Sequence, residues 1–341
     1  MKLLVTGHQG YIGAVAVPLL QAAGHEVVGL DSGFFSGCSF GRFDDGVSAL
    51  DLDLRDVQTK HLRGIEAVVH LAALSNDPLS DLNPRCTYDI NHHASVNLAR
   101  AAKEAGVSRF LFSSSCSNYG AGGDGFLDEN AALNPVTPYG ESKVLVEADV
   151  TKLADDSFHP TFLRNATAYG LSPMLRADLV VNNLVGYAHT TGEVLIKSDG
   201  SPWRPLIHVE DICRGFIAAL AAPVEAIHNR VFNVGQTKEN YRIRDLGDIV
   251  QEEMPGSKVM YAEGASPDKR NYRVDCSRIA QELPDFQPRW TVRDGVRQLR
   301  DAYRQHGLKS EEFLSSRYLR IRRIRDLMEA GRLDTELRWK R

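Results

Sequence analysis

Short apolar runs alternate with longer amphipathic stretches along the first two thirds of the chain. Residues 2–6, 67–73 and 109–112 are nearly continuous apolar runs. Such runs are typical of parallel strands that are buried on both faces of a sheet. Residues 88–105 carry apolar side chains at helical spacing, as expected of a helix that covers such a sheet. The alternation predicts a doubly wound α/β fold built on a parallel sheet.

A glycine-rich turn follows the first predicted strand. Gly7, Gly10 and Gly13 are spaced three residues apart, a helical pattern continues to residue 23, and a second strand ends at Asp31. Glycines let a backbone approach a pyrophosphate closely, and the first turn of a helix presents N–H donors and the positive end of a dipole. A carboxylate at the end of the second strand accepts hydrogen bonds from both ribose hydroxyls and repels a 2′-phosphate. This order predicts a dinucleotide site that favours NAD over NADP.

Tyr139 and Lys143 lie four residues apart in a segment with helical character, so their side chains share one face. An ammonium group beside a phenol favours the phenolate and lowers its pKa from about 10 toward the working pH. Such a tyrosine exchanges a proton with an alcohol or a carbonyl as hydride moves. Taken alone, two exposed helix residues are the simpler interpretation, and only the motifs elsewhere in the chain favour chemistry.

The composition is typical of a soluble globular enzyme. Of the 341 residues, 43% are hydrophobic and 25% are charged, and the net charge is −4. This charge gives no reason to expect nucleic acid or an anionic membrane as a partner, and no apolar run approaches a membrane span. The N-terminus lacks the features of a signal peptide. The 5 cysteines are widely spaced and the 11 histidines show no zinc-type spacing, so we expect reduced thiols, a cytoplasmic location and no metal.

The motifs in this order resemble the extended short-chain dehydrogenase/reductases that act on nucleotide sugars, the epimerase/dehydratase group. The resemblance covers nearly the whole chain. Its motifs are the glycine turn, Asp31, Asp53-Leu54-Arg55-Asp56, His70-Leu71-Ala72-Ala73, Asn91, Ser113-Ser114-Ser115 and Tyr139-x-x-x-Lys143. It implies a Rossmann-like sheet with a smaller C-terminal substrate-binding lobe. Residues 1–170 and 205–236 would form the NAD-binding domain, 171–204 and 237–310 the lobe, and 311–341 a helical extension.

The resemblance also implies roles for individual residues. Ser115 would hydrogen-bond the reacting sugar oxygen, Tyr139 would exchange its proton, and Lys143 would hold the nicotinamide ribose. The implied NAD-binding residues are Gly7, Gln9, Gly10, Tyr11, Ile12, Gly13, Asp31, Asp53, Leu54, Leu71, Ala72, Ala73, Asn91, Ser113, Tyr139 and Lys143. The implied substrate contacts are Ser75, Ser115, Cys116, Ser117, Thr167, Arg176, Asn182, Asn183, Arg204, Asp268 and Arg270. The family's homodimer would use helices over residues 88–105 and 139–154.

The residues after Ser115 narrow the predicted reaction. The 4,6-dehydratases of this group have an Asp-Glu pair there, and the sugar-nucleotide decarboxylases usually keep the Glu. This chain has Cys116 and Ser117, and neither readily replaces a carboxylic acid. We therefore expect an NAD-dependent nucleotide-sugar epimerase, with C4 favoured, that oxidises a hydroxyl, rotates the ketone and returns hydride to its other face. The alternatives are a C4 dehydrogenase or ketoreductase, a dehydratase with other acids, and a non-catalytic dinucleotide-sensing protein.

Two features of the substrate half suggest ligands. Arg204 is a candidate for the substrate diphosphate, because a guanidinium group binds phosphate oxygens in bidentate fashion, although a surface arginine is an equal alternative. Thr167 resembles the epimerases of uronic acid sugars, in which case Arg176 would meet a carboxylate. Threonine is also simply a small polar residue, so this substrate is the less favoured one.

Residues 311–341 extend beyond the usual end of the family. Apolar residues recur there at helical spacing, with arginines crowding the positions between them. The apolar residues are Phe313, Leu314, Ile321, Ile324, Leu327 and Met328, and the arginines are Arg317, Arg320, Arg322, Arg323 and Arg325. A basic helix can bind a membrane or nucleic acid. We expect instead a helix that docks on its own protein or on a partner subunit and keeps its arginines solvated.

Overall fold

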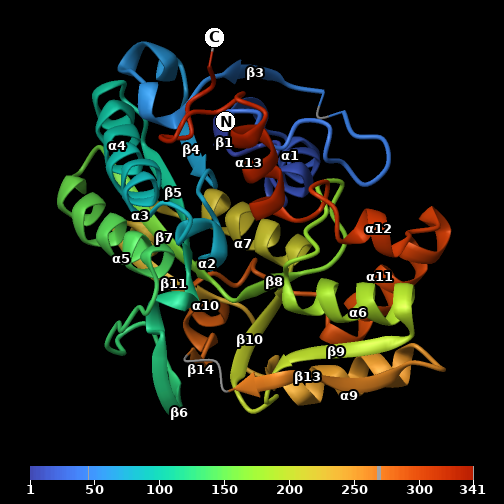
Figure 1. The fold of residues 1–341 in the computed structure, drawn as a ribbon. Helices are drawn as coiled ribbons and strands as arrows, with labels where there is room; N and C mark the ends of the chain where they lie inside the picture. The colour runs from blue at the N-terminus through green and yellow to red at the C-terminus, as the bar shows by residue number, and fades with distance from the viewer. Residues whose placement is uncertain (45, 267–269, 341) are drawn as a thin grey trace.

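A parallel sheet of seven strands forms the centre of the molecule (Figure 1). The computed structural model describes residues 1–44, 46–266 and 270–340. The strand order is β11-β7-β5-β4-β1-β2-β3, and every neighbouring pair is parallel. This order is that of a Rossmann-like doubly wound sheet, so the predicted fold class is confirmed. The strands are β1 (Lys2–Thr6), β2 (Glu26–Asp31), β3 (Ser48–Asp51), β4 (Ala67–His70), β5 (Arg109–Ser115), β7 (His159–Asn165) and β11 (Arg230–Val234).

Helices cover both faces of this sheet, which explains why its inner strands are apolar on both sides. One face packs against α1 (Gly13–Ala22), α7 (Val209–Ala221) and α10 (Ser277–Glu282). The other face packs against α4 (Ala94–Glu104) and α5 (Pro138–Val150). Leu3, Leu4 and Val5 of the central strand are completely buried, as their continuous apolar pattern predicts.

Short helices connect these elements. They are η1 (Leu54–Asp56), η2 (Thr59–Leu62), α2 (Asp77–Ser80), α3 (Pro84–Thr87), η4 (Cys116–Tyr119), η5 (Thr151–Leu153) and α8 (Val224–Ile227). The helix predicted over residues 88–105 is present but begins as a π-helix, η3 (Tyr88–His93), which continues into α4. Single π-turns inside helices are frequently found at functional sites. Here the π-turn carries Asn91, one of the predicted cofactor residues.

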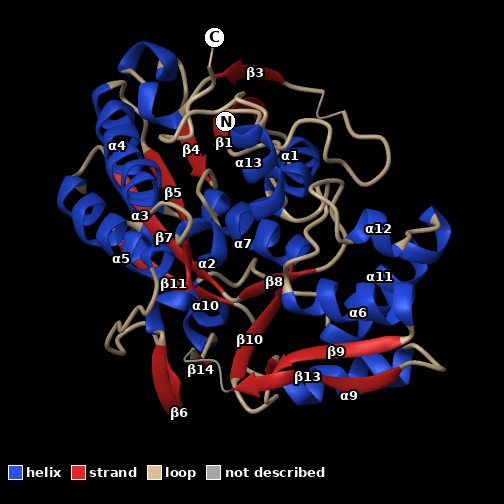
Figure 2. Cartoon of the chain, in the orientation of Figure 1, coloured by secondary structure: helices blue, strands red, loops and turns tan. Residues whose placement is uncertain are grey.

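A second group of elements forms the smaller lobe, which Figure 2 shows beside the carboxyl ends of the central strands. Three small sheets pair β8 (Thr167–Tyr169), β10 (Trp203–His208) and β12 (Asn240–Arg242); β9 (Glu193–Ser198) and β13 (Lys258–Ser266); and β6 (Ala121–Leu127) and β14 (Asn271–Val274). The lobe helices are α6 (Val180–Thr191), α9 (Ile243–Glu253), α11 (Val292–His306) and α12 (Ser310–Phe313). Their own apolar core includes Leu184, Leu246 and Leu299. Within the predicted returning segment 205–236, β11 is the strand that joins the central sheet.

The last helix, α13 (Arg320–Glu329), packs back onto the nucleotide-binding half of the molecule. The expectation of a helix docked on its own protein therefore agrees with the structure. The expectation of a solvated basic face is wrong at Arg320, which is 4% exposed. Across the described ranges, no helix is long and apolar enough to span a membrane. All five cysteines lie in those ranges, and each is buried and unpaired.

Candidate active site

A cavity of about 840 Å³ opens where the carboxyl ends of the central strands face the lobe. This is the position at which open parallel sheets bind their ligands. Most predicted site residues line it: Gly7, Gly10, Tyr11, Ile12, Gly13, Asp31, Asp53, Leu54, Leu71, Ala72, Ala73, Ser75, Ser113, Ser115, Ser117, Tyr139, Lys143, Thr167, Arg176, Asn183, Arg204 and Arg270. The sequence motifs, although far apart along the chain, thus converge on one space.

The glycine turn at the end of β1 has room only for glycine. A Cβ atom on Gly7, whose φ is +71°, would lie 2.8 Å from the backbone nitrogen of Ala72. A Cβ atom on Gly13 would lie 2.2 Å from the carbonyl oxygen of Gly7. Asp31 fixes the turn from the neighbouring strand by accepting hydrogen bonds from the backbone nitrogens of Gln9 (3.2 Å) and Gly33 (2.9 Å). The bare backbone at the start of α1 and the carboxylate beside it fit the pyrophosphate and ribose of a dinucleotide.

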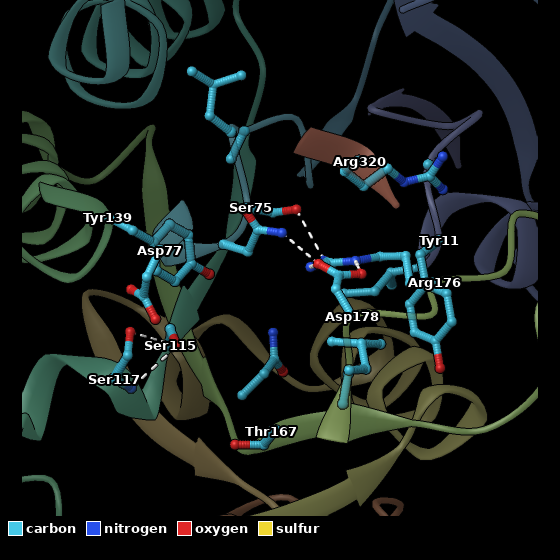
Figure 3. A pocket seen from close by; sticks show the side chains of 18 of the residues that line it. Tyr11, Ser75, Asp77, Ser115, Ser117, Tyr139, Thr167, Arg176, Asp178 and Arg320 are labelled. Atoms are coloured by element: carbon cyan, nitrogen blue, oxygen red, sulfur yellow. Dashed lines mark hydrogen bonds and ion pairs between the residues drawn. The ribbon is translucent and has the colours of Figure 1, made fainter. Parts of the chain in front are cut away.

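Ser115 and Tyr139 lie on the opposite side of the cavity from the glycine turn (Figure 3). Ser115 ends β5, and its Oγ accepts hydrogen bonds from the backbone nitrogen (3.1 Å) and the hydroxyl (2.9 Å) of Ser117. Because both of these bonds reach the lone pairs of Ser115, its own proton remains available for an oxygen in the cavity. Tyr139 is in the first turn of α5, which Thr137 caps by accepting from the backbone nitrogen of Gly140.

Lys143 follows Tyr139 by one helical turn and is 3% exposed. Its Nζ donates to the carbonyl oxygen of Ser113 (2.7 Å) and lies 4.5 Å from the centroid of the Phe112 ring. Burial lowers the pKa of Lys143 to about 7, and the Glu147 carboxylate acts in the opposite direction. Tyr139 and Lys143 therefore share a helix face as predicted, with the Lys143 Nζ 5.8 Å from the centroid of the Tyr139 ring.

The predicted effect of Lys143 on the phenol of Tyr139 is wrong for this structure. Burial raises the pKa of Tyr139, hydrogen bonding with Ser115 is the largest opposing influence, and the charge of Asp77 raises that pKa further. The reason is geometric: the ammonium of Lys143 turns toward the strand carbonyl of Ser113 rather than toward the phenol oxygen. Ser115 is thus the neighbour that favours the phenolate.

A buried polar network behind the cavity holds β5 and α5 together. Arg164 on β7 forms an ion pair with Glu147 on α5, with 2.6 Å between Nη2 and Oε2. The Oε1 of Glu147 also accepts from the hydroxyl of Ser114 (2.5 Å) and from the Nδ2 of Asn118 (3.0 Å). These contacts join the strand that ends in Ser115 to the helix that carries Tyr139.

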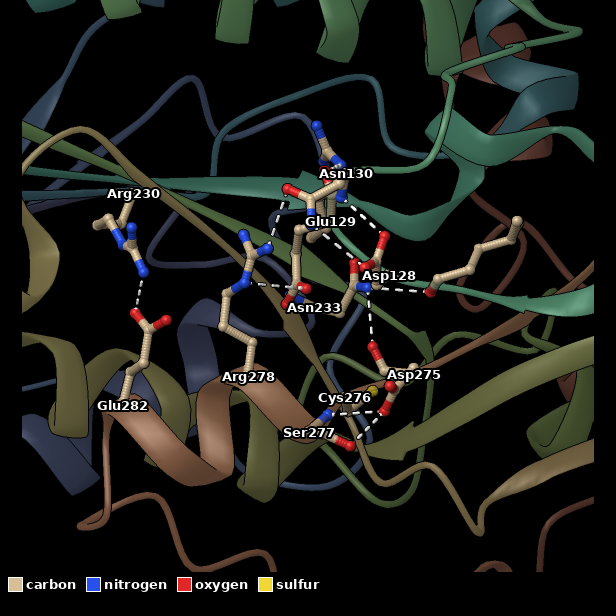
Figure 4. A network of polar contacts seen from close by, with 12 residues as sticks. Asp128, Glu129, Asn130, Arg230, Asn233, Asp275, Cys276, Ser277, Arg278 and Glu282 are labelled. Atoms are coloured by element: carbon tan, nitrogen blue, oxygen red, sulfur yellow. Dashed lines mark hydrogen bonds and ion pairs between the residues drawn. The ribbon is translucent and has the colours of Figure 1, made fainter.

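The network continues toward the far edge of the sheet (Figure 4). Arg164 donates to the hydroxyl of Tyr119 (3.0 Å), which itself donates to Asn233 on β11 (2.7 Å). The backbone nitrogen of Asn233 donates to Glu129 (2.8 Å), and Arg278 of α10 pairs with the same carboxylate at 3.3 Å. The strand that ends in Ser115 and the helix that carries Tyr139 are therefore linked to β11 and α10 by a continuous chain of polar groups.

The comparisons with known proteins agree with this site. The model of the NAD dependent epimerase/dehydratase family matches residues 3–235. The chain belongs to this family. NAD is accordingly its cofactor, and the glycine turn, Asp31 and Lys143 all line the cavity. Of the smaller lobe, β12, α9, β13, β14, α11 and α12 lie after residue 235, outside the matched segment.

Proteins similar to this chain include two named as 4-epimerases of UDP-sugars. The chain is 32% identical over 255 residues to a UDP-glucose 4-epimerase of Lactobacillus helveticus, a match that covers 69% of this chain and 76% of that protein. Among solved structures, it resembles MoeE5 in complex with UDP-glucose and NAD, with a TM-score of 0.78, 26% identity and coverage of 90% and 100% of the two chains. It also resembles a UDP-glucuronic acid 4-epimerase from Bacillus cereus, with a TM-score of 0.76, 25% identity and coverage of 89% and 99%.

Four predicted residues do not line the cavity. The backbone nitrogen of Gln9 donates to Asp31, and Cys116 directs its Sγ to the carbonyl oxygen of Arg164 (3.2 Å). Asn91 is 1% exposed and clamps the backbone of Leu74, accepting from its nitrogen (2.8 Å) and donating to its oxygen (3.1 Å). Asn182 is likewise buried and bonds backbone groups of Gly170 and Arg176. These side chains position the walls of the site, and the prediction for Asp268 falls outside the described residues.

Arg176 and Arg204, two of the three arginines predicted for the substrate, have partners of their own. Arg176 is bound by Asp178 through two hydrogen bonds (3.0 and 2.7 Å) and donates to the hydroxyl of Ser75 (3.0 Å). Asp178 therefore already balances its charge, which removes much of the reason to expect a uronate carboxylate there. Arg204 is 6% exposed, and its guanidinium lies 5.6 Å from the centroid of the Tyr272 ring.

The sequence reasoning missed Asp77, Asp178 and Arg320, which also line the cavity. Asp77 pairs with Arg270, and its Oδ1 is buried without a hydrogen-bond partner among the described residues. Figure 3 places its carboxylate between Tyr139 and the pair Ser115 and Ser117. Only a weak sequence signal exists for it, namely the Asn-Asp-Pro start of the short helix α2. Arg320 comes from the C-terminal extension, where only basic character was visible.

Proposed function

We propose that this protein is a nucleotide-sugar epimerase that inverts C4 of its substrate by transient oxidation to a 4-keto sugar. The observation that carries the proposal is the convergence of Ser115, Tyr139 and Lys143 on one cavity wall. The residues after Ser115 supply no carboxylic acid there, because Cys116 is buried against a carbonyl and Ser117 bonds Ser115. The arrangement provides one exchangeable proton and a hydrogen-bond donor, which suffice for reversible oxidation of an alcohol.

Ser115, Tyr139 and Lys143 have separate roles in this proposed reaction. Bound NAD supplies the hydride acceptor and, in the reverse direction, the hydride donor. The phenolate form of Tyr139 takes the proton of the C4 hydroxyl and becomes the phenol, and Ser115 then donates its proton in a hydrogen bond to the same sugar oxygen. Lys143, fixed by the Ser113 carbonyl, lies beneath Tyr139 where its remaining protons can hold a ribose hydroxyl. After the ketone has turned, Tyr139 returns the proton and the opposite configuration results.

The neighbouring walls fit a nucleotide diphosphate sugar. Arg204 and Arg270 are two cationic side chains at the lobe end of the cavity, and Tyr272 lies under the guanidinium of Arg204. We assign the substrate diphosphate to these arginines because guanidinium groups engage phosphate oxygens in bidentate fashion. The similarity to proteins named UDP-glucose 4-epimerase, and to MoeE5 in complex with UDP-glucose, supports this class of substrate and makes UDP-glucose the first one to test.

A dehydratase is the second candidate, and Asp77 is the observation that favours it. Its carboxylate brings to the side of Ser115 and Tyr139 the type of group that elimination of water requires. The carboxylate of Asp77 is already engaged by the guanidinium of Arg270, which argues against its acting on a sugar hydroxyl. Epimerisation therefore remains the better supported reaction.

The test is a survey of nucleotide sugars by proton NMR with the purified protein. We expect one of them to be converted into its C4 epimer with no NADH accumulating at 340 nm. Accumulation of NADH without inversion would instead support a C4 dehydrogenase or ketoreductase. A 4-keto-6-deoxy product that disappears in Asp77→Asn, but not in Ser117→Ala, would establish the dehydratase. A chain that binds NAD but converts no sugar would favour the sensing protein.

The predicted homodimer and cytoplasmic location belong to the same proposal. Residues 88–104 and α5 lie side by side on one face of the molecule, where Tyr88 donates to Glu141 (2.6 Å) and His92 contacts Asp149 (2.8 Å). This pair of helices is the surface we propose for the dimer. Sedimentation of the parent and of Asn97→Arg, an exposed position on α4, tests it: only the variant should sediment as a monomer.

A further inference from the structure

The chain after α12 returns to the nucleotide-binding half of the molecule and covers it. We call residues 314–340 the C-terminal strap. Its apolar residues Ile324, Leu327, Leu333 and Leu337 form one cluster with side chains from the loops after β2 and β4, from α2 and from η3. These are Phe34, Leu74, Leu79 and Ile90. The strap lies outside the segment that the family model matches, which ends at residue 235. It is therefore an addition of this chain to the matched part of the fold.

Polar contacts hold the end of the strap against residues that line the cavity. Trp339 donates its Nε1 to the carbonyl oxygen of Ser32 (2.6 Å), and Arg338 pairs with Asp53 at 3.4 Å. From the other side, Arg55 donates to the carbonyl oxygen of Glu336 (2.7 Å). Ser32 and Asp53 follow the second and third strands, at the end of the cavity that the Asp31 carboxylate marks as the ribose side.

Arg320, the first residue of α13, is the point where the strap enters the cavity wall. Its Nη2 donates to the carbonyl oxygen of Met174 (2.9 Å), and its guanidinium lies 4.1 Å from the centroid of the Phe35 ring. Its Nη1 is buried and has no hydrogen-bond partner among the described residues. Burial and the nearby charge of Arg176 lower its pKa to about 10, so it remains a cation at neutral pH.

The acids near Arg320 are already engaged. Asp178 binds Arg176, and Asp31 accepts from the backbone of Gln9 and Gly33. A buried guanidinium with an unsatisfied N–H is costly unless an anion meets it. Figure 3 shows Arg320 on the side of Tyr11, which lies within the glycine turn, and away from Tyr139 and Ser115. The anion expected beside a glycine turn and the first turn of a helix is a dinucleotide pyrophosphate.

We propose that Arg320 binds the pyrophosphate of NAD and that the C-terminal strap closes the cofactor end of the cavity over it. The cofactor site is then built from two distant parts of the chain, the strand–turn–helix unit at the N-terminus and the strap. The proposal rests on the family's cofactor and not on the identity of the sugar. It also gives the strap a function, which is to slow the exchange of NAD during repeated cycles of oxidation and reduction.

The experiment compares three ligands by calorimetry on the full-length protein freed of nucleotide. Arg320→Gln keeps a donor for the Met174 carbonyl and removes the charge. We expect this variant to bind ADP-ribose about tenfold to a hundredfold more weakly than the parent, which is the usual value of a charge-assisted hydrogen bond. Adenosine, which lacks a pyrophosphate, should bind within about twofold of the parent. UDP, a probe of the substrate diphosphate, should bind equally to both proteins.

Two controls and a second readout separate charge from folding. Arg325→Gln removes one positive charge from an exposed position of the same helix and should bind ADP-ribose like the parent. Arg320→Lys keeps the charge and should retain most of the affinity. In the NAD-loaded protein, Arg320→Gln should release NAD into a large excess of ADP-ribose at least about tenfold faster than the parent.

The outcomes are distinct. Equal ADP-ribose affinity in the parent and Arg320→Gln, or an equal loss for adenosine and ADP-ribose, would overturn the role of the charge. Weaker binding of UDP alone would assign Arg320 to the substrate diphosphate and also overturn the proposal. If the parent itself bound neither NAD nor ADP-ribose, the cofactor assignment would fail independently of Arg320.

Discussion

The buried pair of Arg164 and Glu147 offers the sharpest test of how the catalytic helix is held. Both side chains are almost completely buried, with exposed fractions of 5% and 8%. Glu147→Gln keeps the shape of the side chain and removes its charge. The variant leaves the guanidinium of Arg164 without a counter-charge and turns an amide donor or a neutral oxygen toward it. Breaking a buried pair in this way costs about 3–5 kcal/mol of unfolding free energy.

Removal of both charges should cost less than the sum of the two single removals. In the double variant Arg164→Met with Glu147→Leu, no buried charge remains, and apolar side chains of similar volume fill the space. The hydrogen bonds from Ser114 and Asn118 to Glu147, and those from Arg164 to the Tyr119 hydroxyl and the Glu129 carbonyl, are lost. At roughly 1 kcal/mol each, we expect a total cost of about 4 kcal/mol. Denaturant unfolding of the parent, of Arg164→Met, of Glu147→Leu and of the double variant measures the coupling between the two sites.

Either of two results would contradict this role for the pair of Arg164 and Glu147. If Glu147→Gln cost less than about 1 kcal/mol, or the double variant cost the sum of the single ones, the pair would not fasten α5 to the sheet. Glu147→Gln should also affect Lys143. Because the Glu147 charge raises the pKa of Lys143, loss of that charge should lower the pKa of Lys143 further.

The remaining predictions concern the cavity itself. Ser115→Ala should lower kcat roughly a hundredfold or more, with KM and bound NAD little changed, because the sugar oxygen loses its hydrogen-bond donor. Steady-state kinetics on the converted nucleotide sugar checks this, and a change in KM alone would argue against it. Gly7→Ala should copurify with less NAD and lose at least about 1 kcal/mol of stability, because the φ of Gly7 is +71° and the new Cβ would meet Ala72. An unchanged content of bound NAD would contradict the fit of the glycine turn to the dinucleotide. Burial lowers the pKa of Lys143 from its unfolded value of 10.5 to about 7, so the folded protein binds fewer protons than the unfolded one between these pH values and its stability rises with pH across that window. The free energy of unfolding of the parent minus that of Lys143→Met should therefore increase between pH 7 and 10, by up to about 1.4 kcal/mol per pH unit, and a flat or falling difference would show that Lys143 is not held neutral.

The parts of the site that the sequence predicts are those encoded by local pattern. The glycine turn could be recognised because Gly7, Gly10 and Gly13 sit between an apolar strand and a helix. Tyr139 and Lys143 share a face because helix geometry places residues four apart together. The parallel sheet was predictable because strands buried on both faces are apolar throughout.

The parts that the sequence did not reveal depend on contacts across long separations. Asp77 meets Arg270 across 193 positions, and Arg320 reaches the carbonyl of Met174 across 146. No local pattern encodes such contacts. Asn91 shows a different limit: its helix was predicted, but a π-turn directs the side chain to the backbone of Leu74 instead of the cavity. The pKa of Tyr139 depends on burial, which a motif does not specify.

The measurement closest to the central claim follows the C4 proton of a nucleotide sugar by NMR in the presence of the parent and of Tyr139→Phe. We expect the parent to establish an equilibrium between two C4 epimers, while the variant, which still carries NAD, converts them at least about a hundredfold more slowly. Inversion at the parent's rate by Tyr139→Phe would show that the phenol of Tyr139 does not carry the proton, and the proposed chemistry would then be wrong.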